Sequence, residues 1–373
     1  MAEDEPLEAD RIEGAPHPRE TSALFGQHGA EAAFLDAFNG GRMHHAWLIA
    51  GPRGVGKATL AWRIARFLLS RTDEPAGMFA PEPPTTLAIP DDHPVARRTR
   101  AMSEPGLLLI RRAWDEKDKK LKTVITVDEV RRLSAFLALS SAEGGRRVVI
   151  VDAADEMNPQ AANALLKLRE EPPKRSTLIL VSHAPARLLP TIRSRCRTLR
   201  CTALAPGDMS AALAAMGEEP GADAEALADL AGGSVGEALS LIHLDGLKLY
   251  RDLAALLDGA PNMDRGRLLS LANAMTGRAN AEKFDLTLRL FARLLSRLAR
   301  TGAGLPPEIE IARGERALLT RLAPDAQAGR HWADLQQSLG ARMAHGKAVN
   351  LDPSALILDM GLTLNQSAAA TSA

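Results

Sequence analysis

Eight residues, Gly51 to Ala58, have the types and spacing of a phosphate-binding loop except at the last position. The pattern is G-x-x-x-x-G-K-[ST]; its glycines let backbone N–H groups converge on phosphates, and its lysine neutralises the outer ones. The last residue normally supplies a hydroxyl to magnesium. Ala58 has none, and Thr59 is turned away by about 100°, one helical step. We therefore predict a nucleotide site that lacks part of its metal-binding chemistry.

A carboxylate further along the chain is the second candidate for nucleotide chemistry. Residues 147–152 form a short apolar run that ends in Asp152, and in nucleotide hydrolases an aspartate in such a position helps to hold magnesium. The next residue, Ala153, cannot polarise a water molecule. The residues predicted to contact the nucleotide are Gly51, Arg53, Gly54, Gly56, Lys57, Thr59 and Asp152.

The segments on both sides of the loop are suited to position it. Residues 44–50 are a short apolar run typical of a buried strand, and residues 58–70 have apolar residues at helical spacing. A strand, a glycine loop and a helix in this order place an anion at the helix N-terminus. The flanks therefore favour a phosphate-binding fold over a simple glycine turn.

Strands and helices alternate along the first half of the chain, which predicts a mostly parallel α/β sheet with phosphates at its carboxyl edge. Further strands are expected at 107–110, 147–152 and 177–181, and helices near 127–140 and 158–171. We assign this α/β domain to residues 21–203, with an irregular, proline-rich insertion at 71–106.

From residue 204 onward the pattern is helical throughout. A small helical lid is expected at 204–243, and a C-terminal helical oligomerisation domain at 247–365. Within it, residues 281–300 carry apolar side chains at alternating spacings of four and three, which indicates helix–helix packing. The two ends, residues 1–20 and 366–373, are predicted to be disordered tails.

The composition argues against several classes of protein. The 46 basic and 46 acidic side chains balance, which disfavours a protein whose whole surface grips nucleic acid. The two cysteines, Cys196 and Cys201, are too few for a disulfide framework or a zinc site. The acidic N-terminus does not read as a signal peptide, and no apolar stretch approaches a membrane span. We expect a soluble, cytoplasmic protein.

Several short motifs in a fixed order carry a resemblance to a known family. They are Val148–Met157, Ala161–Lys167, Glu170–Pro173 and Leu189–Cys196. Together they closely resemble the delta-prime subunit family of the bacterial DNA polymerase III clamp loader, within the AAA+ proteins. The resemblance is strong over roughly residues 22–240 and extends to the later helices only by type. It implies an AAA+ P-loop parallel-sheet domain, a small helical lid and a C-terminal helical collar.

The resemblance also implies a role in trans for one arginine. Clamp loaders are rings that open a sliding clamp and close it around primed DNA in replication, with ATP sites between neighbouring subunits. Their Ser-Arg-Cys motif supplies an arginine finger to the adjacent site, and Ser194, Arg195 and Cys196 match it. Arg195, with Ser194, would then act on a neighbour's ATP. The implied partners are the gamma/tau motor and delta subunits, the clamp through the complex, and primed DNA bound weakly without sequence preference.

Departures from the family's motor subunits are as informative as the matches. Motors have a hydroxyl, a glutamate and a lid arginine where Ala58, Ala153 and Gly236 stand here. The four-cysteine zinc module that family members often carry has no counterpart in the insertion, so no structural zinc is expected. The combination implies a non-hydrolysing stator subunit of the DNA polymerase holoenzyme, without ATPase activity of its own. Whether the loop binds ATP or ADP without hydrolysis is left open.

Other functions compete with this interpretation. An active AAA+ ATPase motor subunit of the same complex would have to tolerate Ala58 and Ala153. A small-molecule kinase would need acceptor-binding residues, and a DNA-binding module with a vestigial loop would need more positive charge and more aromatic residues. Arg195 could also be an ordinary surface arginine, because Arg193 and Arg197 are close to it in sequence.

Overall fold

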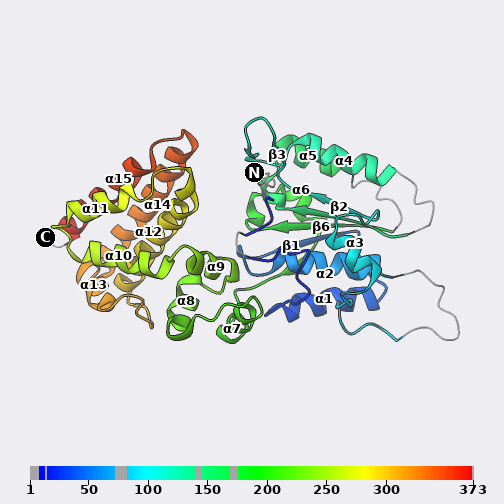
Figure 1. Cartoon of the computed structure of the whole chain (residues 1–373), viewed down its shortest axis with the longest axis horizontal. Helices are drawn as coiled ribbons and strands as arrows, with labels where there is room; N and C mark the ends of the chain where they lie inside the picture. The colour runs from blue at the N-terminus through cyan, green and yellow to red at the C-terminus, as the bar shows by residue number, and fades with distance from the viewer. Residues whose placement is uncertain (1–7, 13–14, 72–81, 139–144, 169–174, 372–373) are drawn as a thin grey trace, which may run out of the picture. The chain divides into compact units, whose positions relative to one another are not determined.

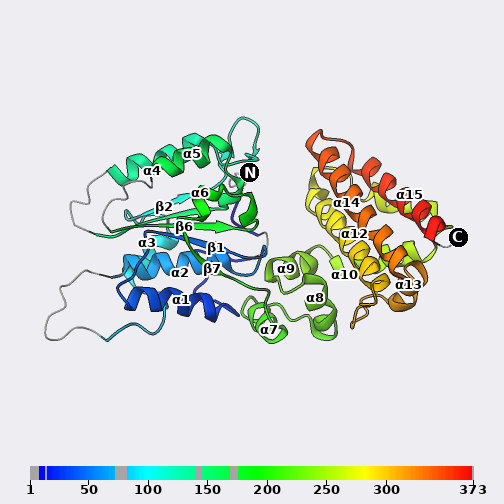
Figure 2. The same ribbon diagram turned by 180° about the vertical axis from the view of Figure 1, so that it is seen from behind.

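The computed structural model describes residues 8–12, 15–71, 82–138, 145–168 and 175–371. The chain divides into two compact units, which are considered separately (Figures 1 and 2). The first consists of Met1–Glu218 with Gly233–Gly236, and the second of Glu219–Gly232 with Glu237–Ala373.

A five-stranded parallel sheet forms the centre of the first unit. Its order is β2-β5-β6-β1-β7, with bounds Leu107–Ile110, Arg147–Asp152, Ser176–Ser182, Ala46–Ala50 and Arg197–Arg200. All five residues of β1 are buried, as expected for a parallel strand covered on both faces. This architecture confirms the predicted α/β fold, and the strands expected at 107–110 and 147–152 have the predicted bounds.

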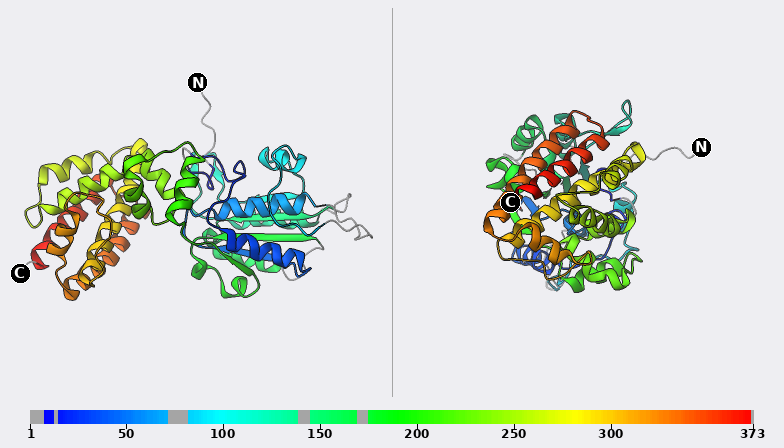
Figure 3. Two further views of the ribbon diagram at one scale, coloured as in Figure 1. Left: turned by 90° about the horizontal axis from the view of Figure 1, so that it is seen from below. Right: turned by 90° about the vertical axis from the view of Figure 1, so that its left-hand side faces the viewer.

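Helices cover both faces of this sheet. Helices α1 (His28–Asn39) and α2 (Lys57–Leu69) lie on one face, and α4 (Val127–Ala138) and α5 (Pro159–Leu168) lie on the other (Figure 1). Figure 3 shows α1 and α2, in blue, running along the sheet. Besides α3 (Pro94–Arg100), which is described below, the unit also contains β3 (Trp114–Asp115), β4 (Lys120–Leu121), η1 (Ala154–Glu156), η2 (Pro185–Arg187), α6 (Pro190–Arg193) and α7 (Pro206–Ala214).

The segment expected to be an irregular insertion contains a helix. Within 71–106, Pro94–Arg100 forms α3, and residues 72–81 lie outside the described residues. The His93 ring accepts a hydrogen bond from the Val95 N–H at 3.2 Å, and Pro94 occupies the first helical position. Proline is favoured at that position because the helix does not need its N–H. The proline therefore starts a helix here and does not mark irregular chain.

Both ends of the chain are more ordered than predicted. Residues 8–12 and 15–20 pack on the first unit, where the His17 side chain is fully buried. At the other end, α15 (Pro353–Thr371) extends into the expected tail, and Ala368 is fully buried. Residues 1–7, 13–14 and 372–373 lie outside the described part. At the N-terminal end, polar residues are ordered because their charges are paired. At the C-terminal end, small residues are ordered because their side chains are packed.

The second unit consists of helices in its described part. Its elements are η3 (Gly221–Asp223), α8 (Ala224–Ala231), most of α9 (Val235–His243), α10 (Gly246–Asp258), α11 (Arg265–Asn273), η4 (Arg278–Asn280), α12 (Ala281–Gly302), α13 (Glu315–Leu322), α14 (Ala326–Ala348) and α15. Helix α12 packs against α14 where Gly302 meets Gly329, because a Cβ on Gly302 would lie 2.6 Å from the Gly329 Cα. The packing stripe predicted on this helix is confirmed by the buried Phe284, Phe291, Leu295 and Leu298.

The residues expected to form a separate lid, 204–243, are divided between the two units. Helix α7 belongs to the first unit and α8 to the second. Helix α8 is attached to α12 by hydrogen bonds from Arg293 to the carbonyl oxygens of Asp229, at 3.2 Å, and Leu230, at 3.1 Å. Over the described residues, the structure contains no helix with the length and apolar character needed to cross a membrane.

Candidate functional site

The phosphate-binding loop joins β1 to α2, as the sequence predicts, and glycine is required within it. Gly54 and Gly56 have φ angles of +74° and +94°, in the left-handed region that favours glycine. Gly51 is enclosed, because a Cβ there would lie 2.2 Å from the Cys201 carbonyl oxygen. The loop therefore keeps the backbone path that lets N–H groups converge at the start of α2.

Gln27, a residue that the sequence analysis missed, fastens this loop to its surroundings. Its buried side-chain NH2 donates to the carbonyl oxygens of Val55, at 3.0 Å, and Thr202, at 2.8 Å, while its oxygen accepts from the Thr202 N–H at 3.1 Å. One amide thus connects the start of α1, the loop and the segment after β7. No local motif signals this role, because its partners are distant in sequence.

Lys57 is buried at the start of α2, and its ammonium group donates to the Pro52 carbonyl oxygen. Burial lowers the pKa of Lys57 to about 8, against the opposing influence of Cys201, Asp152 and Asp155. The cation is therefore incompletely compensated by the protein, which suits a position where an anion binds.

Asp152 lies where predicted, at the carboxyl end of β5 and close enough to Lys57 for their charges to interact. Burial, followed by the negative charge of Asp10, raises the pKa of Asp152 to about 7. The raised pKa reflects the removal of this carboxyl group from water and the negative charges around it. The structure thus brings Lys57 and Asp152 together at the carboxyl edge of the sheet.

The neighbouring positions do not supply the missing groups. Ala153 is buried and Ala58 is half-buried, and neither side chain has a polar atom. Asp155 already has a partner, since its Oδ1 accepts a hydrogen bond from the backbone N–H of His183 at 2.9 Å. Burial, followed by the positive charge of Lys57, lowers the pKa of His183 to about 4. His183 is therefore neutral at pH 7.

Of the remaining predicted contacts, Arg53 lies within the loop and Thr59 in the first turn of α2. Arg53 is exposed and Thr59 is half-buried. The segment Gly233–Gly236, which belongs to the same unit, touches the loop directly, because the Gly236 N–H donates to the Gly54 carbonyl oxygen at 3.2 Å. A Cβ on Gly54 would lie 2.2 Å from the Ser234 Oγ. Next to the loop, this segment therefore presents the backbone of Gly236, which has no side chain.

Arg195 and Ser194 lie away from the loop residues in the chain, on the turn between α6 and β7 at the edge of the sheet. Both side chains are exposed, while Ile192 of α6 is buried and anchors the turn. The Arg195 Nη1 donates to the Thr191 carbonyl oxygen at 3.1 Å, and the Ser194 Oγ donates to the same oxygen at 3.4 Å. The Arg195 guanidinium group therefore lies at the surface, on a turn that the buried Ile192 anchors.

Comparison with known proteins gives a consistent result. The family described as DNA polymerase III, delta subunit, matches residues 26–205. DNA polymerase III subunit delta' of Pseudomonas aeruginosa is 35% identical over 227 residues, which cover 60% of this chain and 63% of the relative. Subunit delta' of Escherichia coli K12 is 31% identical over 241 residues, which cover 64% of this chain and 66% of the relative.

A gamma/tau subunit also shares part of this sequence. DNA polymerase III subunit gamma/tau of Mycobacterium tuberculosis is 30% identical over 213 residues, which cover 55% of this chain and 32% of the relative. The chain spans a little under two thirds of the lengths of the two delta' relatives.

Proposed function

Because the chain belongs to the DNA polymerase III delta-prime subunit family, we propose that it is the non-hydrolysing stator of a clamp loader. In this role it donates Arg195 to the ATP site of a neighbouring gamma/tau-type motor subunit. The complex so completed loads the sliding clamp on primed DNA in the cytoplasm during replication. The delta subunit is the other proposed partner, and contact with DNA would be weak and independent of sequence.

The observation that carries this proposal is the contrast between two sites on one chain. The chain's own loop lacks a metal hydroxyl at Ala58 and a water-polarising carboxylate at Ala153, whereas Arg195 is exposed on a turn fixed by Thr191. A motor subunit needs the first set of groups, and a subunit that acts in trans needs only the second. The residues present therefore favour donation to a neighbour over hydrolysis in cis.

The chemistry proposed for Arg195 is electrostatic. Negative charge on the γ-phosphate oxygens develops in the transition state, and a guanidinium group aimed at it lowers the barrier. The guanidinium group is planar, permanently charged and able to donate several hydrogen bonds at once. The bond to the Thr191 carbonyl oxygen restricts the side chain before docking, which reduces the entropy cost of placing it in a neighbour's site.

The chain's own loop fits a nucleotide only in part. Its glycines and Lys57 are the groups that would hold phosphates, with Asp152 close to Lys57, but the groups for hydrolysis are missing. ATP or ADP held there would therefore stay intact. The experiments below separate this binding question from the action of Arg195 in trans.

The test is the ATPase rate of a reconstituted clamp loader with substitutions in this chain alone. Arg195→Ala should reduce clamp- and DNA-stimulated turnover by about tenfold or more, since arginine fingers contribute about 10³–10⁵ in GTPases. Arg193→Ala is the matched control, because it removes an exposed arginine two positions away and should leave turnover near the unsubstituted rate. Equal rates for both variants, with the complex still assembled, would refute the proposal.

A further inference from the structure

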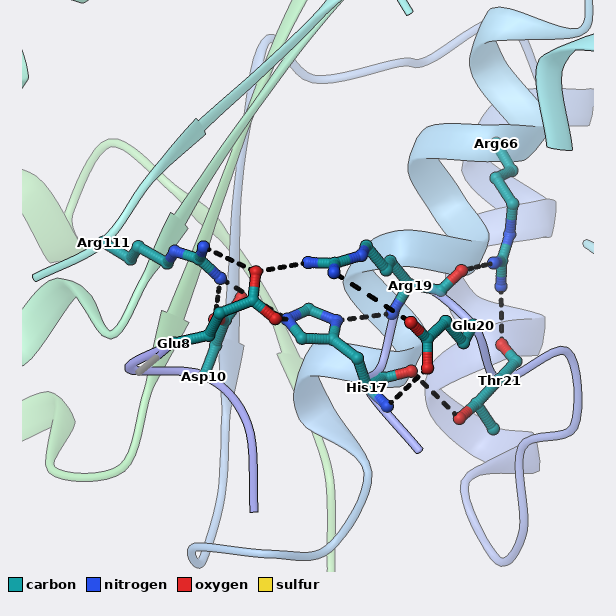
Figure 4. A network of polar contacts seen from close by, with 8 residues as sticks. All are labelled: Glu8, Asp10, His17, Arg19, Glu20, Thr21, Arg66 and Arg111. Carbon is teal, nitrogen blue, oxygen red and sulfur yellow. Dashed lines mark hydrogen bonds and ion pairs between the residues drawn. The ribbon is translucent and has the colours of Figure 1, made fainter. Parts of the chain in front are cut away.

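The acidic segment Glu8–Ile12 is anchored at the carboxyl end of β2. Arg111, which directly follows β2, forms ion pairs with Glu8, at 2.8 Å between Nη2 and Oε1, and with Asp10 (Figure 4). The Asp10 side chain is fully buried. A buried carboxylate held by an arginine is a specific contact, because leaving either charge unpaired would be costly.

A second set of contacts ties the following residues to α2. The His17 Nε2 lies 3.2 Å from the Asp10 Oδ2, and the His17 ring meets the Trp62 ring edge-on, with centroids 6.1 Å apart. Arg66 of α2 donates to the carbonyl oxygens of Arg19 and Thr21, at 2.8 Å in each case (Figure 4). The N-terminal residues are therefore held at two places, on β2 and on α2.

These anchors place the segment beside the phosphate-binding loop. Ile110 pairs with Val151, so Arg111 and its partner Asp10 lie next to Asp152 at the carboxyl edge of the sheet. A Cβ on Gly236 would lie 2.6 Å from the Ile12 Cδ1 and 3.2 Å from the Gly54 Cα. Ile12 and the loop thus approach the same glycine.

The segment opposes an incoming nucleotide in two ways. The apolar side chain of Ile12 lies against Gly236, which itself donates to the Gly54 carbonyl oxygen of the loop. The charged side chains of the segment itself, Glu8, Asp10 and Arg11, add a net negative charge beside Asp152, which disfavours the approach of phosphates. Both effects require the segment to be docked in the position described.

We propose that residues 8–12, here called the N-terminal strap, are a built-in cover that lowers the affinity of this chain's own loop for nucleotides. If the loop is uncovered in about a tenth of the molecules or fewer, the apparent affinity falls by about tenfold or more. The inference concerns the loop around Lys57 and does not depend on the role of Arg195.

The test is the binding of fluorescently labelled ADP to the isolated full chain, followed by fluorescence anisotropy with magnesium present. Two variants weaken the strap independently: a chain without residues 1–12, and Arg111→Met, which removes the ion pairs to Glu8 and Asp10. Each should bind ADP about tenfold more tightly or better. Arg11→Ala changes an exposed side chain within the strap and should bind as the unsubstituted chain does.

Adding Lys57→Met to each strap variant locates any gained binding. If Lys57→Met abolishes the increase in ADP affinity, the additional ADP is bound at the loop, which supports the proposal. Unchanged ADP affinity in Arg111→Met, with the thermal unfolding midpoint retained, would overturn the proposal even if the truncated chain fails to fold. A gain that survives Lys57→Met would also overturn it. Because the motor subunits are absent, neither result bears on the arginine finger.

Discussion

Three ionisable side chains at the carboxyl edge of the sheet are buried deeply enough to alter their protonation. Burial lowers the pKa of Lys57 to about 8, raises that of Asp152 to about 7 and lowers that of His183 to about 4. Asp152 also faces the negative charge of Asp10. What speaks against metal-dependent hydrolysis in cis is that Ala58 and Ala153 offer neither a hydroxyl nor a carboxylate group.

His183 makes a prediction about acid stability. Its pKa is about 4 in the folded chain and 6.5 ordinarily, so the unfolded chain binds more protons between these values. Its contribution to stability is therefore fully present above pH 6.5 and is lost as the pH falls toward 4. When the pH is lowered from 7.5 to 5, the unfolding free energy of the unsubstituted chain should fall by about 1 kcal/mol more than that of His183→Gln. This value is reduced from the full linkage effect because His183 is partly exposed. Urea unfolding at both pH values measures this, and equal losses would contradict it.

The sequence was sufficient for residues that belong to a contiguous motif and insufficient for those that act at a distance. Lys57 and Asp152 could be predicted because strand–loop–helix order and the apolar run before Asp152 determine where they lie. Gln27 and Asp10 could not, because their partners Thr202 and Arg111 are brought near only by the fold. No spacing rule connects such pairs before the topology is known.

At the scale of elements, periodicity predicted the strands and helices well where burial governs the pattern. Strands β2 and β5 have apolar runs that match their buried faces. The differences occur where polar or small residues become ordered through specific partners, as His17 does through Asp10. A prediction from composition alone assigns such segments to disordered tails, because composition contains no information on ion pairs formed with a distant strand.

The junction of α1, the loop and β7 depends on Gln27, which gives a second prediction. Gln27→Leu keeps the volume of the side chain but leaves the Val55 and Thr202 backbone groups without their partner. We expect a loss of about 2 kcal/mol in unfolding free energy, the cost of buried unsatisfied groups. His28→Ala, at the exposed neighbouring position, should change stability by less than about 0.5 kcal/mol. Denaturant titration distinguishes them, and a Gln27→Leu loss no larger than the control's would contradict the assignment.

At the scale of the whole molecule, the two units differ in what stabilises them. The first contains the sheet, the loop and Arg195, and the second is a helical assembly with a buried charge network. Within the second, the fully buried Glu315 receives hydrogen bonds from the Tyr250 hydroxyl and from Arg297, the latter at 3.2 Å. The spacing of apolar residues predicts which helix faces are buried. It cannot predict which polar side chains of α10, α12 and α13 bond to one another.

This network supports a third prediction. Glu315→Ala leaves the buried Arg297 with Asp229 as its remaining described carboxylate partner and leaves the Tyr250 hydroxyl without its acceptor, which should destabilise the second unit by about 3 kcal/mol. Glu308→Ala removes an exposed carboxylate nearby in sequence and should have little effect. Limited proteolysis with identification of the cleavage sites would show faster cutting within the second unit for the first variant. Equal cleavage rates in the two variants would contradict the prediction.

The central claim is that this chain acts on a neighbour's nucleotide and not on its own. The most direct measurement is ATP turnover by the reconstituted clamp loader, with Lys57→Met and Arg195→Ala placed separately in this chain. We expect Arg195→Ala to lower turnover by about tenfold or more and Lys57→Met to leave most of it. The reverse result, with turnover lost in Lys57→Met and retained in Arg195→Ala, would show that this chain is a motor subunit.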